Sequence, residues 1–111
     1  MSEKSFFEKT RPYKLKILSD HINGKLNSIE NSEILIDDIS SLNNAKDSEI
    51  TFFSNLALKE ELKNSSAGAC VINELNVDFA TKDMPLILCD DPYMGFALIS
   101  QKFYPKELNV N

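Results

Sequence analysis

The chain has 111 residues, of which 42% are hydrophobic and 26% are charged, and its formal net charge is −5. These values are typical of a single globular domain with its own core, and they exclude an intrinsically disordered chain. The acidic balance and the lack of a lysine and arginine cluster argue against polymeric DNA or RNA as a partner, because a phosphate backbone attracts a basic surface.

The N-terminus lacks the long apolar stretch of a signal peptide, and no window of the sequence is apolar enough to span a bilayer. The two cysteines, Cys70 and Cys89, each lie in an apolar run without a CxxC or Cys/His motif. They are interpreted as buried thiols in a reducing compartment, in preference to a disulfide or zinc ligands. These features predict a cytoplasmic protein.

The first predicted element is a helix over residues 14–23, where apolar residues recur at helical spacing and Gly24 follows as a C-terminal cap. The β-rich run 33–39 predicts a strand. The polar run 40–48 is expected to be a surface loop, and it leads into a short strand over 49–53.

Residues 56–63 predict a two-turn helix, with Asn55 as its N-cap. Further strands are expected over 69–73 and 85–89, and a weaker one over 77–80. The alternation of strands and helices predicts an α/β domain, a small mixed β-sheet flanked by helices.

Asp91 and Pro92 predict the start of the last helix, an N-cap followed by proline at the first helical position, and this helix is expected to end near Tyr104. Between Met94 and Ile99 it has almost no polar face, which is typical of a helix covered on both sides. Part of this cover is expected from a second subunit or from further chain.

The order of the sequence motifs resembles the N-terminal uridine-binding domain of the LpxD family, the UDP-3-O-(3-hydroxyacyl)glucosamine N-acyltransferases of lipid A biosynthesis. The resemblance covers nearly the whole chain. It rests on LSDHING at 18–24, ISSLNNA at 39–45, DSEITFFSN at 47–55, ELKNSSAGACVI at 61–72 and DDPY at 90–93.

The resemblance implies a domain over residues 14–104, with a Mur-ligase-like N-terminal fold, between an extension (1–13) and a tail (105–111). Family enzymes transfer a 3-hydroxyacyl chain from acyl carrier protein to UDP-3-O-acyl-glucosamine, without a cofactor. In the family, a following β-helix of hexapeptide repeats forms a homotrimer and supplies the catalytic histidine. This chain contains no such repeat, so it is expected to bind the UDP-sugar without catalysis and to be mainly monomeric in isolation.

The sole histidine, His21, lies at the end of the first predicted helix and is interpreted as a polar helix-end residue, not as a general base. No catalytic residue is therefore assigned. The acidic pairs 37–38 and 90–91 raise the alternative of a magnesium site, but a third ligand is missing. They are interpreted as a solvated strand end and a helix cap.

The family pattern Phe-x-x-Asn-x-x-Tyr, whose aromatics flank uracil, maps onto Phe52, Asn55 and Leu58. A base stacked on an aromatic ring gains about 1–3 kcal/mol, and an amide offers both a donor and an acceptor to the imide edge of uracil. The N-terminus of the 56–63 helix would favour a diphosphate, with Lys59 as a further electrostatic aid.

Leu58 departs from the pattern, because one ring of the expected sandwich is lost. Tyr93 and Tyr104 are candidates to replace it by residue type alone. Successive strand residues face opposite sides, so Phe52 is assigned to the pocket and Phe53 to the core. Without the resemblance, both phenylalanines would be interpreted as core residues.

Three functions remain open. The first is the uridine-binding domain of the lipid A N-acyltransferase. The second is the N-terminal UDP-binding domain of a Mur-type ligase, which a P-loop ATPase domain would follow. The third is a non-catalytic interaction module without a nucleotide site.

Overall fold

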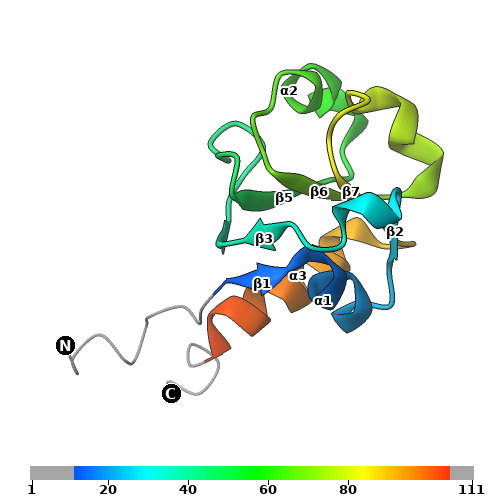
Figure 1. Ribbon diagram of the computed structural model, residues 1–111. Coiled ribbons are helices and arrows are strands. Elements are labelled where there is room, and N and C mark those ends of the chain that lie inside the picture. Colours follow the sequence, from blue (N-terminus) through cyan, green and yellow to red (C-terminus); the bar gives the residue numbers. More distant parts are fainter. Residues whose placement is uncertain (1–11, 106–111) are drawn as a thin grey trace.

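The computed structural model describes residues 12–105, and a five-stranded sheet forms its centre (Figure 1). The strand order is β2-β7-β6-β5-β4, in which the last four strands are mutually parallel and β2 pairs antiparallel with β7. The predicted α/β class with a mixed sheet is therefore confirmed. The strands are β2 (Lys25–Leu26), β4 (Asp38–Ile39), β5 (Glu49–Phe53), β6 (Ala69–Ile72) and β7 (Leu86–Leu88).

Helices cover both faces of this sheet (Figure 1). The helices α1 (Leu15–His21) and α3 (Pro92–Phe103) lie on one face. The other face carries α2 (Lys59–Lys63) with two 3-10 segments, η3 (Leu56–Leu58) and η4 (Glu74–Phe79). A small ribbon of β1 (Tyr13–Lys14) and β3 (Leu35–Ile36), with η2 (Ile29–Asn31) before β3, completes the described chain.

Strand alternation divides the core into two clusters, one on each face of the sheet. Within β5, Ile50 belongs to the cluster beneath α1 and α3, whereas Phe53 is only 1% exposed and belongs to the cluster on the α2 side. Phe52 is half-buried and packs against the α3-side cluster. The assignment of Phe53 to the core is confirmed.

The predicted strands and helices are partly confirmed. The strand predicted over 49–53 has its expected bounds. Helices lie within both predicted ranges, 14–23 and 56–63, and the second range begins as a 3-10 turn. The weak strand over 77–80 is wrong, because this run belongs to η4, whose N-cap Asn73 accepts a hydrogen bond from the Leu75 N–H at 2.8 Å.

The single strand predicted over 33–39 is also wrong, since the chain changes partners within it. Ile36 pairs with Tyr13 in the antiparallel ribbon, whereas Ile39 pairs with Ile50 in the parallel sheet. Asp37 separates the two short strands. Propensity predicts extended backbone here, but the partner of each half is set by tertiary contacts.

The end of α1 differs from the prediction in which residue adopts the left-handed conformation. Asn23 has a φ of 56°, and the Gly24 N–H donates to the Ser19 carbonyl at 2.8 Å, as in a Schellman motif. Gly24 is needed for packing instead, because a Cβ there would lie 2.5 Å from Ile87 Cγ2. Asparagine tolerates the left-handed conformation at position 23, so a glycine is not required there. The glycine at position 24 instead allows the close approach to Ile87.

The start of α3 is confirmed: the Asp91 carboxylate accepts a hydrogen bond from the Met94 N–H at 3.1 Å, and Pro92 follows the cap. Tyr93 and Met94 are 65% and 53% exposed, so the first turn is uncovered on one side within the described chain. Most of the predicted extension and tail lies outside the described residues.

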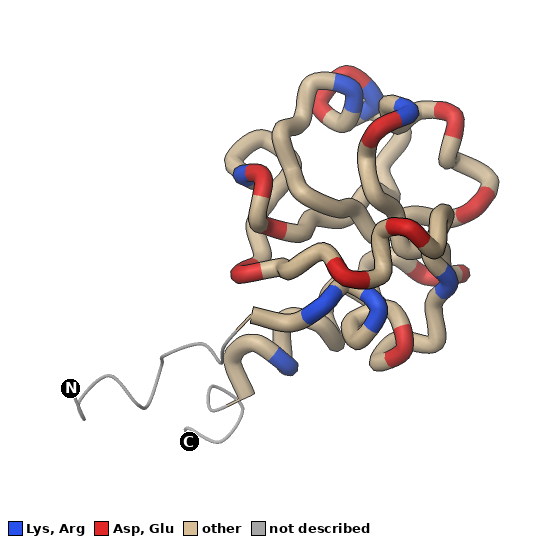
Figure 2. Tube along the Cα trace, viewed as in Figure 1, with Lys and Arg blue, Asp and Glu red and all other residues tan. Residues whose placement is uncertain are grey.

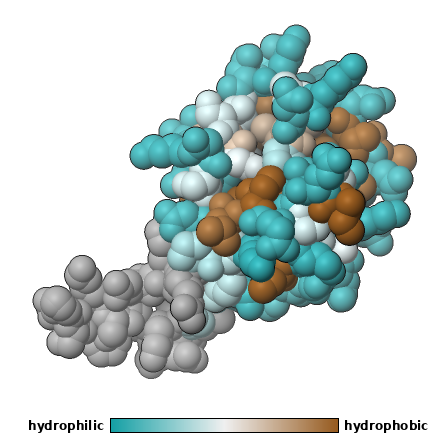
Figure 3. All heavy atoms as spheres, viewed as in Figure 1, coloured by the Kyte–Doolittle hydropathy of each residue, from teal (hydrophilic) through white to brown (hydrophobic). Residues whose placement is uncertain are grey.

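The surface carries interspersed acidic and basic residues along the tube in Figure 2. On the face in Figure 3, hydrophobic residues form small separate patches between hydrophilic ones. None of the helices within residues 12–105 combines the length and the hydropathy needed to cross a membrane.

Candidate functional site

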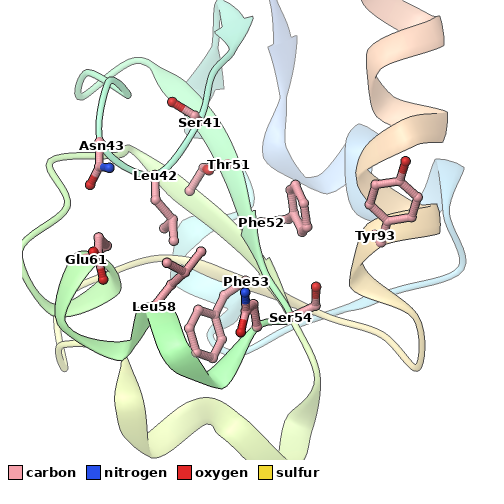
Figure 4. A pocket seen from close by; sticks show the side chains of 11 residues that line it. Ser41, Leu42, Asn43, Thr51, Phe52, Phe53, Ser54, Leu58, Glu61 and Tyr93 are labelled. Carbon is pink, nitrogen blue, oxygen red and sulfur yellow. The ribbon is translucent and has the colours of Figure 1, made fainter.

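A cavity of about 370 Å³ lies at the carboxyl end of β5 (Figure 4). Its walls come from the loop after β4, from the end of β5 with the following η3 and α2, and from the first turn of α3. Cavities of this size at the carboxyl ends of parallel strands commonly bind small molecules. The lining residues are Ser41, Leu42, Asn43, Thr51, Phe52, Phe53, Ser54, Asn55, Leu58, Glu61 and Tyr93.

All three residues of the predicted uridine motif line this one cavity. Phe52 is the half-buried residue next to the last in β5, Asn55 caps the following turn, and Leu58 lies one turn further, 37% exposed. They lie close together because η3 follows β5 after only two residues. Their role in binding stays a prediction.

An aromatic cluster surrounds the Phe52 ring. The ring centroid of Tyr93 lies 5.7 Å away at 62°, and that of Phe96 lies 4.8 Å away at 35°. These separations are those of favourable aromatic pairs. Tyr93 thus lines the cavity as the sequence allowed, whereas Tyr104 donates its hydroxyl to Asp38 at 2.7 Å and does not line the cavity.

The apolar walls lie on opposite sides of β5. In Figure 4, Phe52 and Tyr93 lie on the α3 side of the strand, while Leu42 and Leu58 lie on the α2 side. A flat group inserted between these walls would contact a ring on one face and aliphatic side chains on the other.

Asn55 is an N-cap, as the sequence predicts. Its Oδ1 accepts a hydrogen bond from the Ala57 N–H at 3.0 Å and so caps η3. Its contact with a base stays a prediction. The cap occupies one lone pair of Oδ1, and the Nδ2 donors remain for a ligand.

The electrostatics of the cavity are weakly acidic. Among the described residues that line it, Glu61 alone is charged. The Lys59 ammonium lies 5.1 Å from the centroid of the Phe79 ring and does not line the cavity. The α-helical part α2 has five residues, so it offers little helix dipole, and the geometry does not support the expected aid of Lys59 and the helix N-terminus to a diphosphate.

Several lining residues carried no clear signal in the sequence. Ser41 and Asn43 belong to the run interpreted as a plain surface loop, and Thr51 lies in the strand. Thr51 is fully buried, and its hydroxyl finds no hydrogen-bond partner within the described part of the chain.

The remaining candidates lie elsewhere or have structural roles. Asp91 caps α3, as predicted, and His21 is exposed at the end of α1. Between residues 12 and 105, no group of three His, Cys, Asp or Glu side chains is placed to hold a metal ion. Cys70 is buried and Cys89 half-buried, both as free thiols, and burial raises the pKa of each.

Fold and cavity define an α/β domain with a ligand-sized cavity at the carboxyl edge of a mainly parallel sheet. A family model described as UDP-3-O-(3-hydroxymyristoyl) glucosamine N-acyltransferase, LpxD, matches residues 33–102, more than half of the chain. The chain belongs to the LpxD family.

Curated relatives carry corresponding names. UDP-3-O-acylglucosamine N-acyltransferase of Parvibaculum lavamentivorans is 29% identical over 107 residues, which cover 96% of this chain and 30% of the relative. UDP-3-O-acylglucosamine N-acyltransferase 2 of Legionella pneumophila strain Lens is 31% identical over 107 residues, with 96% and 31% covered. The Polaromonas naphthalenivorans relative is 34% identical over 86 residues, with 78% and 24% covered. The chain thus spans less than a third of each relative.

Proposed function

We propose that this chain is the uridine-nucleotide-binding domain of an N-acyltransferase that acts on UDP-3-O-acyl-glucosamine in cytoplasmic lipid A biosynthesis. One observation carries the proposal: the positions onto which the family's uracil-binding pattern maps, Phe52, Asn55 and Leu58 with leucine in place of tyrosine, line a single cavity together with Tyr93. The family match favours this function over a Mur-type ligase domain or a non-catalytic module.

In this proposal the nucleoside enters the cavity and the phosphates stay outside it. The base lies between Phe52 and Tyr93 on one side and Leu58 on the other, and an Asn55 amide N–H donates to a base carbonyl. Glu61 disfavours a phosphate in the cavity by like-charge repulsion, and its carboxylate suits the ribose hydroxyls as an acceptor.

The role of the domain is anchoring. Binding energy from the uridine holds the distant glucosamine at a reacting site, and such remote binding contributes to catalysis by positioning. The acyl transfer from acyl carrier protein, and the trimer contacts, belong to the hexapeptide-repeat part of family enzymes. The chain of 111 residues is expected to bind without catalysing and to be mainly monomeric, which light scattering tests: a tight trimer contradicts it.

Titration of the ¹⁵N-labelled chain with UDP-N-acetylglucosamine tests the binding site directly. The amides of Phe52, Asn55 and Leu58 are expected to shift in a saturable manner, and Phe52→Ala is expected to weaken the titration. N-acetylglucosamine 1-phosphate is the matched ligand control, because it lacks the uridine. Amides around the cavity that stay unchanged at millimolar UDP-N-acetylglucosamine would refute the proposed function.

A further inference from the structure

The turn that leads from β7 into α3 is held by a side chain from the end of β6. The Asn73 Nδ2 donates to the Asp90 carbonyl at 3.1 Å, although the two residues are 17 positions apart. The backbone pairing of β6 and β7 ends just before, with the bond from the Cys89 N–H to the Ile72 carbonyl at 3.1 Å. The Asn73 side chain therefore adds one more link where the sheet ends.

Both ends of the Asn73 side-chain amide are engaged. Its Oδ1 accepts a hydrogen bond from the Leu75 N–H at 2.8 Å and caps η4, while its Nδ2 donates to Asp90. The segment η4 packs with α2 on one face of the sheet, whereas Asp90 leads into α3 on the other. One side chain thus connects the helical layers of both faces at the carboxyl edge of the sheet.

Few free torsions separate the Asp90 carbonyl from the Tyr93 side chain. Asp91 is the N-cap of α3, and its carboxylate is fixed by the hydrogen bond from the Met94 N–H at 3.1 Å. Pro92 follows, and its ring fixes its φ. A displacement of the Asp90 carbonyl is therefore passed on to Tyr93, because the two residues between them cannot absorb it.

Tyr93 depends on this backbone because its own side chain is poorly packed. It is 65% exposed, and its ring meets that of Phe52 at a centroid distance of 5.7 Å. The distance of α3 from the sheet is set at Gly95, where a Cβ would lie 2.9 Å from Ile22 Cδ1. The contact at Gly95 fixes how near the helix lies, and the bond from Asn73 fixes where its first turn begins.

We propose that Asn73 is a positioning residue, which holds the Asp90 carbonyl and thereby keeps the Tyr93 ring against Phe52. This inference rests on the proposed uridine site, in which these two rings form one wall. Asn73 itself does not line the cavity. Its effect on a bound nucleotide is therefore exerted through the position of Tyr93.

Asn73→Ser separates the two hydrogen bonds of this side chain. Serine keeps an N-cap oxygen for η4, but it is too short to reach Asp90 as well. One neutral hydrogen bond changes an equilibrium by up to about tenfold, so UMP is expected to bind Asn73→Ser about threefold more weakly than wild type. Asn73→Asp also keeps the cap and lacks the donor, and it is expected to lose at least as much.

Ser28→Ala is the matched control for these titrations. It removes the N-cap of another 3-10 segment, η2, in which the Ser28 Oγ accepts from the Glu30 N–H at 3.3 Å. Ser28 does not line the cavity. The affinity of Ser28→Ala for UMP is expected to equal that of the wild-type chain, and a loss as large as that of Asn73→Ser would contradict a specific role of Asn73.

A double-mutant cycle with Tyr93→Leu shows whether Asn73 acts through the ring. In the Tyr93→Leu chain, the further change Asn73→Ser is expected to leave the UMP affinity unchanged, because no ring is left to misplace. A merely structural role of Asn73 would lower the affinity in both backgrounds. An equal loss in the two backgrounds therefore overturns the inference.

The tyrosine ring signals in NMR spectra test the positioning without a ligand. The chain has three tyrosines, so selective labelling gives few signals, and Phe52→Leu identifies those of Tyr93. In Asn73→Ser, the Tyr93 ring protons are expected to shift because they move relative to the Phe52 ring. The signals of Tyr13 and Tyr104 are expected to stay. Tyr93 signals that coincide in both chains would show that Asn73 does not position the ring.

Failure of this inference is distinguishable from failure of the proposed function. If UMP binds the wild-type chain and Asn73→Ser equally well, the uridine site stands and the inference is overturned. If UMP does not bind the wild-type chain at millimolar concentration, the uridine site is wrong. The ring signals then decide by themselves whether Asn73 positions Tyr93.

Discussion

Replacing Leu58 with tyrosine is expected to tighten uridine binding, because it restores a ring at the position where the family pattern has one. Leu58 lines the cavity, is 37% exposed and lies on the opposite side of β5 from Phe52 (Figure 4). A ring at this position would replace aliphatic contact with stacking on the second face of the base. The wild-type chain has its second ring, Tyr93, on the same side as Phe52.

The size of the gain follows from one favourable effect and two unfavourable ones. Stacking contributes about 1–3 kcal/mol per base. Fixing the tyrosine rotamer costs about 0.5–1.5 kcal/mol, and the aliphatic contact of Leu58 is lost. The net effect is about 1 kcal/mol, which corresponds to roughly fivefold tighter binding.

Isothermal titration of UMP into the wild-type chain and Leu58→Tyr measures this difference. The matched control is Leu56→Tyr, which adds the same ring two residues earlier, at a side chain that is 52% exposed and does not line the cavity. Its affinity is expected to stay within twofold of wild type. The reasoning is refuted if both variants melt at the wild-type temperature and Leu58→Tyr binds UMP no better than Leu56→Tyr.

Three further predictions concern stability. A Cβ at Gly68 would overlap the Asp47 carbonyl oxygen, so Gly68→Ala is expected to lower the free energy of unfolding in urea by about 1–3 kcal/mol; an unchanged urea midpoint would contradict it. Asp91→Ala removes the cap of α3 and is expected to cost about 1 kcal/mol in thermal unfolding, whereas Asp90→Ala, at an exposed neighbour, serves as the control. Burial raises the pKa of the Cys70 thiol above its ordinary value of 9.0, so the unfolded chain loses this proton first as the pH rises. Stability is then expected to fall above about pH 9 by up to about 1.4 kcal/mol per pH unit; Cys70→Ala should remove this part of the slope, and an identical pH profile in both chains would exclude the thiol as its source.

Local signals predicted those elements whose side chains decide their own conformation. The strand Glu49–Phe53 and the start of α3 at Pro92 were predictable because a run of β-branched and aromatic residues and an Asp-Pro cap act within a few residues. Around Ile36 the extended backbone was predictable but the change of strand partner was not, because tertiary contacts set each partner. Around Val77 the predicted strand was wrong, because the run belongs to η4, which Asn73 caps.

Residue types at fixed spacing were enough to predict the α/β class, the family and the motif positions Phe52, Asn55 and Leu58. The contact between Tyr93 and Phe52 was not predictable in this way, because α3 is distant in sequence and packs against β5. The structure also decided that β4 stops short and exposes a backbone edge beside the cavity. The length of a strand pairing is set by where two chain segments diverge, and no local pattern in β5 records it.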